Sequence, residues 1–117
     1  MRWRDGNGHR PPAWLLRVRD MLHDEWRTPR SLSEMARAAG VHQCHLAHEF
    51  RRYYGGTVCG YLRRLRLNWA VSQLAQTRTP ASWIALDAGY CDQSHFTREM
   101  KAGLGVTPSQ FRKMVAS

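Results

Sequence analysis

Four polar residues near the end of this 117-residue chain have side chains suited to recognising bases: Gln93, Ser94, His95 and Arg98. An arginine forms paired hydrogen bonds with guanine O6 and N7, and a glutamine pairs with adenine. At about 100° per residue, Phe96 and Met100 fall together on the other side of the same helix. The spacing predicts an amphipathic helix with Ser94, Arg98 and Lys101 facing outward and Gln93 and Thr97 on its flank. Alternatively, Gln93 and His95 only complete the helix start, or the four residues contact phosphates.

The residues around this helix predict a helix-turn-helix. Ala81 to Ala88 forms a short helix, Gly89 makes the turn, and Tyr90 follows it as an apolar plug. Asp92 has a carboxylate that can accept the free N–H groups of the next helix, which we expect to end near Ala102. Thr107-Pro108-Ser109 opens a last short helix. In such a motif the second helix enters the DNA major groove.

The composition agrees with a polyanionic partner. The chain has 18 Lys and Arg against 9 Asp and Glu, a net charge of +9. That excess favours nucleic acid, the alternative being a cationic protein without such a partner. Hydrophobic residues make up 43%, enough to exclude compositional disorder.

The chain shows no sign of secretion or membrane insertion. Cys44, Cys59 and Cys91 are odd in number and form no CxxC, which argues against a disulfide framework and fits a reducing cytoplasm. The N-terminus has no apolar core of a signal peptide, and no apolar run approaches a membrane span. We therefore expect a cytoplasmic protein, associated with the nucleoid through DNA.

The first half of the chain predicts a similar set of helices. One runs from Ala13 to about Trp26, and Ser31 with Glu34 forms a capping-box pattern that opens a second, ended by Gly40. A third helix is expected over residues 43–53, and Thr57 caps a long helix that runs to about residue 76.

The two halves match each other as an internal repeat. Ala36 and Gly40 correspond to residues 49 positions later, and Leu46, Phe50 and Gly55 to residues 50 positions later. One residue is therefore inserted in the second turn. The connecting helix, at 1.5 Å per residue, is roughly 30 Å long, close to the turn of B-DNA at about 34 Å. Two recognition helices can thus enter successive major grooves.

The predicted fold is all-α, with two homeodomain-like helix-turn-helix subdomains. We expect a flexible leader over residues 1–12, subdomains over 13–56 and 77–117, and the linker helix over 57–76. Twelve residues are too few for an effector-binding or dimerisation domain. The chain is then either a stand-alone regulator or a piece of a longer one.

The segment GYCDQSHFTREMK, followed by GVTPSQFRK, resembles the DNA-binding domain of the AraC/XylS family of transcription regulators. The resemblance extends from about Ala13 to Val115 and implies binding to promoter DNA, usually by an activator that recruits RNA polymerase. It places Gln93, Ser94, His95 and Arg98 at positions that face the groove. Three others suit phosphate better than bases: Thr97, Lys101 and Ser109.

The first recognition helix is less typical. Its groove-facing positions carry Gln43, Cys44, Ala47 and His48, and Arg51 lies behind them. His42 stands where Asp92 stands in the second unit, so we expect a weaker cap. We expect this helix to contact fewer bases, such as thymine methyls through Ala47, and phosphates through Arg51 and Arg52.

Other chemistry has little support. Cys44 and His48 lie four apart on one helix face, but two ligands are incomplete, so we predict no metal and no cofactor. No catalytic motif appears, and we predict no enzyme. Trp83 is expected to pack partly over Ala81. The alternative is an exposed contact for polymerase or another protein.

These observations predict a sequence-specific regulator, an activator, that binds promoter DNA as a monomer. The alternative is an interaction protein that keeps the fold without strong base readout and acts through non-specific DNA binding or polymerase contact.

Overall fold

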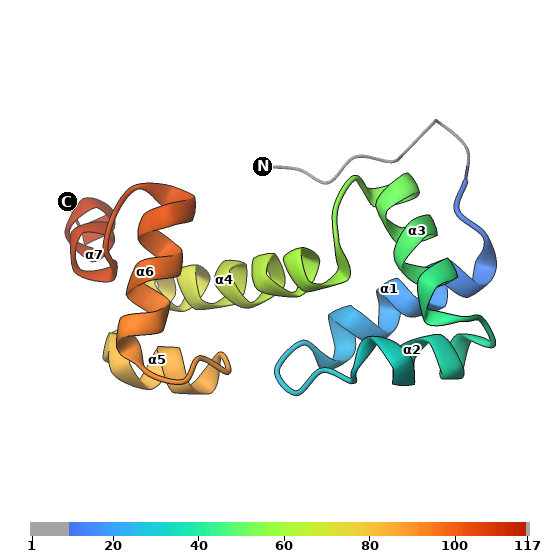
Figure 1. Ribbon diagram of the computed structural model, residues 1–117. Coiled ribbons are helices and arrows are strands. Elements are labelled where there is room, and N and C mark those ends of the chain that lie inside the picture. The colour runs from blue at the N-terminus through green and yellow to red at the C-terminus, as the bar shows by residue number, and fades with distance from the viewer. Residues whose placement is uncertain (1–9, 117) are drawn as a thin grey trace. The chain divides into compact units, whose positions relative to one another are not determined.

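The computed structural model describes residues 10–116, and throughout them the chain is helical with short connections (Figure 1). The helices are α1 (Ala13–Glu25), α2 (Leu32–Ala39), α3 (Gln43–Tyr54), α4 (Val58–Gln76), α5 (Ala81–Asp87), α6 (Gln93–Leu104) and α7 (Pro108–Ala116). The predicted all-α class is confirmed. Most of the expected leader, residues 1–9, lies outside the described residues. Among the described helices, none has the length and apolar character needed to cross a membrane.

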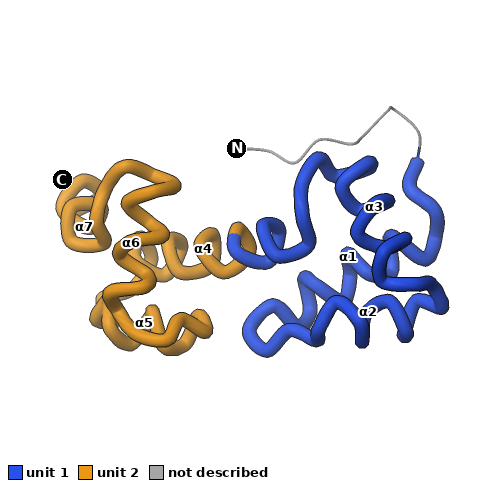
Figure 2. Tube along the Cα trace, viewed as in Figure 1, with its two compact units in different colours: residues 1–63 blue, residues 64–117 orange. Residues whose placement is uncertain are grey.

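The chain divides into two compact units, residues 1–63 and 64–117, and their boundary falls inside α4 (Figure 2). In unit 1, α1, α2 and α3 pack on one another, and its fully buried side chains include Leu15, Val18, Leu22, Leu46 and Phe50. In unit 2, α5 packs on α6, and its buried side chains include Leu74, Ile84, Ala85, Phe96 and Met100. Each unit therefore has a core of its own.

The two helix-turn-helix turns have the same backbone pattern. After α2, the N–H of Val41 donates to the carbonyl of Ala36 at 3.0 Å; after α5, the N–H of Tyr90 donates to the carbonyl of Ala85 at 2.9 Å. Gly40 ends α2 with a φ of +76°, a left-handed conformation that favours glycine. These bonds match at the predicted offset of 49, so the repeat seen in the sequence is a repeat of turn geometry.

The predicted capping box at the start of α2 is confirmed. The hydroxyl of Ser31 accepts from the N–H of Glu34 at 3.1 Å, and the carboxylate of Glu34 accepts from the N–H of Ser31 at 3.0 Å. Two N–H groups that have no partner within the helix are satisfied in this way. This cap fixes where α2 begins, and α2 supports α3.

The expectation for Trp83 was wrong. Its side chain is 70% exposed rather than packed over Ala81, and Leu86 on the same helix is 63% exposed. The helix α5 has only seven residues, and Ile84 and Ala85 supply its buried contact. Because only two residues of α5 are buried, side chains on its other sides have few neighbours to cover them.

We predict that the pKa of Glu34 lies below its ordinary value of 4.5, mainly because the backbone N–H of Ser31 donates to the carboxylate. A lowered folded-state pKa contributes stability above the ordinary value, and that contribution is lost as the pH falls through the lowered pKa. NMR titration of the side chain measures the pKa directly. Glu34→Gln, which keeps an acceptor oxygen but does not titrate, is the control for the pH dependence of unfolding. A pKa at or above 4.5 would contradict the capping box.

Candidate nucleic-acid interface

The helix α6 is held by two side chains that are completely buried, Phe96 and Met100. Its other sides carry the polar residues predicted from the sequence. Those exposed to solvent are Gln93, Ser94, Arg98 and Lys101, whereas His95 and Thr97 are half-buried. In the part of the chain that the structure describes, the guanidinium of Arg98 has no ion pair, so its donors are available to a ligand.

The start of α6 is fixed by a carboxylate. Oδ1 of Asp92 accepts from the N–H of His95 at 2.8 Å, which is the predicted N-cap. The cap also places a negative charge at the positive end of the helix dipole. Because the cap sets the first residue of α6, it places Gln93 and Ser94 in the first turn.

A hydrogen-bonded group on the inner flank of α6 was missed by the sequence analysis. The hydroxyl of Tyr90 donates to Oε1 of Glu99 at 3.0 Å, and Oε2 of Glu99 lies 3.3 Å from Nε2 of His95. The rings of Tyr90 and His95 meet edge to face with their centroids 5.0 Å apart, and the guanidinium of Arg66 lies over the Tyr90 ring, 5.4 Å from its centroid. Tyr90 is thus more than an apolar plug: it ties α6 to the turn.

The sequence signal for this group was the four-residue spacing of His95 and Glu99, which places both on one helix face. The buried tyrosine that completes the group comes from the turn. Its distance from Glu99 depends on tertiary packing.

The helix α3 is anchored in the same way as α6, by a buried apolar pair on its inner side. Leu46 and Phe50 are completely buried, and the ring of His45 packs against Trp14 at 5.3 Å. The predicted groove-facing residues Gln43, Cys44, Ala47 and His48 are all exposed, and so is Arg51 behind them.

The helix α3 is capped by a histidine, and its expected weakness relative to the Asp92 cap stays a prediction. His42 is the N-cap, and its Nδ1 accepts from the N–H of Cys44 at 3.1 Å. A histidine nitrogen accepts only when it carries no proton, so this cap requires the tautomer with hydrogen on Nε2. The position is therefore capped, but by a neutral group rather than by the carboxylate found in α6.

The two arginines that follow His48 differ in their surroundings. Nη1 of Arg52 lies 3.5 Å from Oε1 of Glu49, and its guanidinium also lies over the ring of Tyr53 at 5.4 Å. Arg51 has no ion pair among the described residues. Glu49 matches Glu99 in the repeat, and both carboxylates are half-buried on inner flanks. The outward faces of both helices are therefore left without acidic groups.

The start of α7 carries a second reciprocal cap. Oγ1 of Thr107 accepts from the N–H of Gln110 at 3.1 Å, and Oε1 of Gln110 accepts from the N–H of Thr107 at 2.9 Å. Ser109, in the first turn, is exposed. A capped helix start with an exposed hydroxyl is a suitable neighbour for a phosphate.

The described residues hold no cluster of three or more histidine, cysteine or acidic side chains that could bind a metal. Cys44, Cys59 and Cys91 are all free and exposed.

Two helix-turn-helix units, each with a capped and internally anchored second helix, define a dual helix-turn-helix DNA-binding protein. Residues 35–114 match a protein family described as a helix-turn-helix domain. The chain belongs to the AraC family of transcription regulators, whose DNA-binding domains are not enzymes.

Known relatives show how far the likeness extends. The transcriptional activator AarP of Providencia stuartii is 34% identical over 70% of this chain and 61% of its own length. The regulatory protein SoxS of Escherichia coli K12 is 32% identical over 72% of this chain and 78% of its own length. A Chromobacterium violaceum regulator structure with an AraC-type DNA-binding domain has a TM-score of 0.81 and 27% identity, covering 89% of this chain and 93% of that one.

Exchange of the two caps tests their difference. We predict that His42→Asp stabilises the protein by a few tenths of a kcal/mol, up to about 1 kcal/mol, because a carboxylate also interacts with the helix dipole. Asp92→His should destabilise it by about the same amount. Thermal and denaturant unfolding measure both changes. Equal effects of the same sign would contradict the assignment of different caps.

Proposed function

We propose that this chain activates transcription by inserting α3 and α6 into successive major grooves of promoter DNA. The observation that carries the proposal is that both helices are anchored and capped in the same way. In each, a buried apolar pair and a side-chain cap fix the orientation, and the outward face carries basic and polar groups without acids. Such a face suits the edges of bases and the phosphates beside them.

In α6 we assign base contacts to Arg98 first. Its exposed guanidinium has the paired donors that fit guanine O6 and N7, a contact worth about 1–3 kcal/mol of discrimination. Gln93 and Ser94, both exposed in the first turn, are assigned to neighbouring bases. His95 offers less, because its Nε2 lies beside Glu99; we assign it to base contact through its remaining exposed edge and to positioning of the helix.

Phosphate contacts are assigned to residues on either side of these. Lys101 is exposed at the far end of α6, and Thr97 lies half-buried on its flank. Ser109 contributes from the first turn of α7. In α3, the exposed and unpaired Arg51 is the principal phosphate ligand, with Arg52 beside it.

The first recognition helix supplies less base discrimination in this proposal. Cys44 and Ala47 are exposed but short, and Ala47 suits a thymine methyl. Gln43 and His48 remain as hydrogen-bonding groups, and both are exposed. Most sequence specificity then comes from the second unit.

The mode of action is proposed from the relatives and from the repeat. AarP is named a transcriptional activator, which supports activation. Contact with RNA polymerase is part of the same proposal. One chain carries two recognition helices, so a monomer can occupy two grooves. The place of action is the cytoplasm, at the nucleoid, where promoter DNA lies.

A second candidate function is non-specific DNA binding without strong base readout. The short side chains at Cys44 and Ala47 favour it. Selection on random duplexes separates the two. Sequence-specific binding through two recognition helices predicts an asymmetric motif in two parts about one helical turn apart, whereas non-specific binding predicts no motif.

Three alanine variants test the assigned contacts. We predict that Arg98→Ala relaxes specificity at one base by about 1–3 kcal/mol. Lys101→Ala should weaken binding about equally on all sequences and reduce the salt slope by about 1. His48→Ala should cost less specificity than Arg98→Ala. The measurement is binding to matched and scrambled sites at several salt concentrations, and a reversed ranking of Arg98 and His48 would contradict the proposal.

A further inference from the structure

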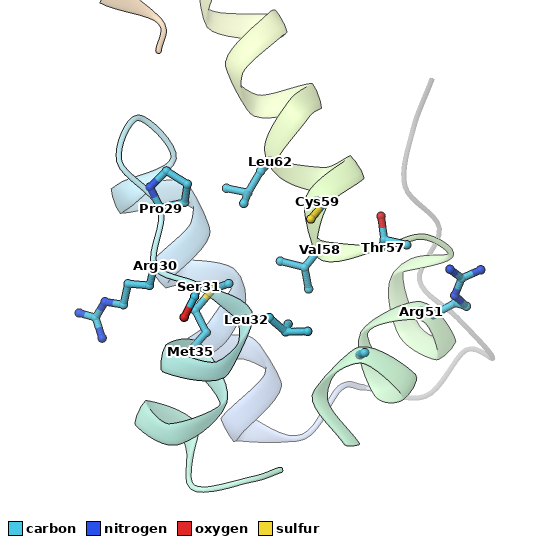
Figure 3. A pocket seen from close by; sticks show the side chains of 11 residues that line it. Pro29, Arg30, Ser31, Leu32, Met35, Arg51, Thr57, Val58, Cys59 and Leu62 are labelled. Atoms are coloured by element: carbon cyan, nitrogen blue, oxygen red, sulfur yellow. The ribbon is translucent and has the colours of Figure 1, made fainter. Parts of the chain in front are cut away.

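Unit 1 contains an apolar pocket of about 390 Å³, bounded by the start of α2, the middle of α3 and the first turns of α4. Figure 3 shows Leu32, Val58 and Leu62 around the space, with Pro29 and Met35 on its α2 side. The volume is within the range of small-molecule sites, about 300–1,000 Å³. The pocket is therefore large enough for a compact organic ligand.

The charges around the pocket have one sign. No acidic residue lines it, whereas two arginines do, Arg30 and Arg51. Arg30 is already paired with Glu25 at 3.1 Å. Arg51 has no ion pair among the described residues, so its charge is uncompensated. The pocket thus combines apolar walls with one available cation.

Two of the polar lining residues, Arg51 and Thr57, lie on the α3–α4 side of the pocket, which we take as its mouth. Figure 3 shows Arg51 extending outward beside Thr57, away from the apolar side chains. The hydroxyl oxygen of Thr57 accepts from the N–H of Gly60 at 3.0 Å, which leaves its hydrogen free to donate. An anionic group at the mouth can meet both donors while its apolar part fills the interior.

The internal repeat shows that this lining is particular to unit 1. The positions that match Pro29, Leu62 and Cys59 are Arg78, Arg112 and Ser109. Arg112 donates to the carbonyls of Leu74 and Thr77 at 3.2 and 2.8 Å. Packing of a helix-turn-helix therefore does not require apolar residues at these positions, and unit 1 departs from unit 2 where its pocket lies.

We propose that this pocket binds a small amphipathic monocarboxylate, with its apolar body among Leu32, Met35 and Leu62 and its carboxylate on Arg51 and Thr57. The thioether of Met35 favours an aromatic body. In the proposed function, Arg51 is also the phosphate ligand of α3. A carboxylate bound to Arg51 therefore competes with the DNA backbone, and this coupling rests on the proposed function. Ligand binding therefore weakens DNA binding by unit 1.

Calorimetric titration of the DNA-free chain with 4-phenylbutanoate tests the pocket, with the neutral 4-phenylbutanamide as the matched probe. We expect one acid per chain and about tenfold weaker binding of the amide, because the charge-assisted hydrogen bond is lost. Arg51→Gln should reduce acid binding to the level of the amide. Cys59→Phe, which fills the pocket from an exposed position, should abolish binding of both probes.

Cys91→Phe is the matched control, since Cys91 is an exposed cysteine in unit 2, and it should leave binding unchanged. Circular dichroism verifies that each variant is folded. Equal binding of acid and amide, or acid binding that persists in Cys59→Phe, would overturn the proposal.

Duplex binding then tests the coupling. The acid should weaken DNA binding by the original chain and have no effect on Arg51→Gln; an unchanged affinity of the original chain would overturn the coupling. Failure to bind any duplex would instead overturn the proposed function and the competition with it. The titration without DNA still decides whether the pocket binds the acid.

Discussion

Burial of one apolar pair in each recognition helix is the constraint on which the interface depends. Leu46 with Phe50, and Phe96 with Met100, are completely buried. Turning either helix by one residue, about 100°, would bring these side chains into water, and each is worth about 1.5–3 kcal/mol when buried. The helices therefore cannot rotate to suit a ligand. Caps at His42 and Asp92 fix where they begin, so the outward residues have a set direction before DNA is met.

The two units share this buried pair and capped helix start, and they differ in the side chains around the recognition helix. Unit 2 has a carboxylate cap and a Tyr90–Glu99–His95 group that ties its recognition helix to the turn. Unit 1 has a histidine cap, short side chains on its recognition helix, and an apolar pocket beside it. In the proposed function, unit 2 supplies most of the base contacts, and the phosphate ligand of unit 1, Arg51, lines the pocket.

Local features were predictable from the sequence, whereas features that join distant segments were not. The capping box of Ser31 and Glu34, the glycine turns and the buried pairs depend on residues three or four positions apart, and the structure contains them. Capping by Nδ1 of His42 depends on the tautomer and the rotamer of this side chain, and the sequence specifies neither. Exposure of Trp83 depends on how narrow the buried contact of α5 is. The pocket requires the spacing of three helices, so no periodicity indicates it.

Amide chemical-shift mapping tests the central claim most directly. The chain, uniformly labelled with nitrogen-15, would be titrated with a duplex obtained by selection, and shifts would be followed residue by residue. Contact through the outward faces predicts the largest changes at the exposed residues of α3 and α6 and at the start of α7. Buried amides near Phe50 and Met100 should change little, because the frame does not rotate. Shifts concentrated around Trp83 and Leu86 on α5, with α6 unaffected, would contradict the account.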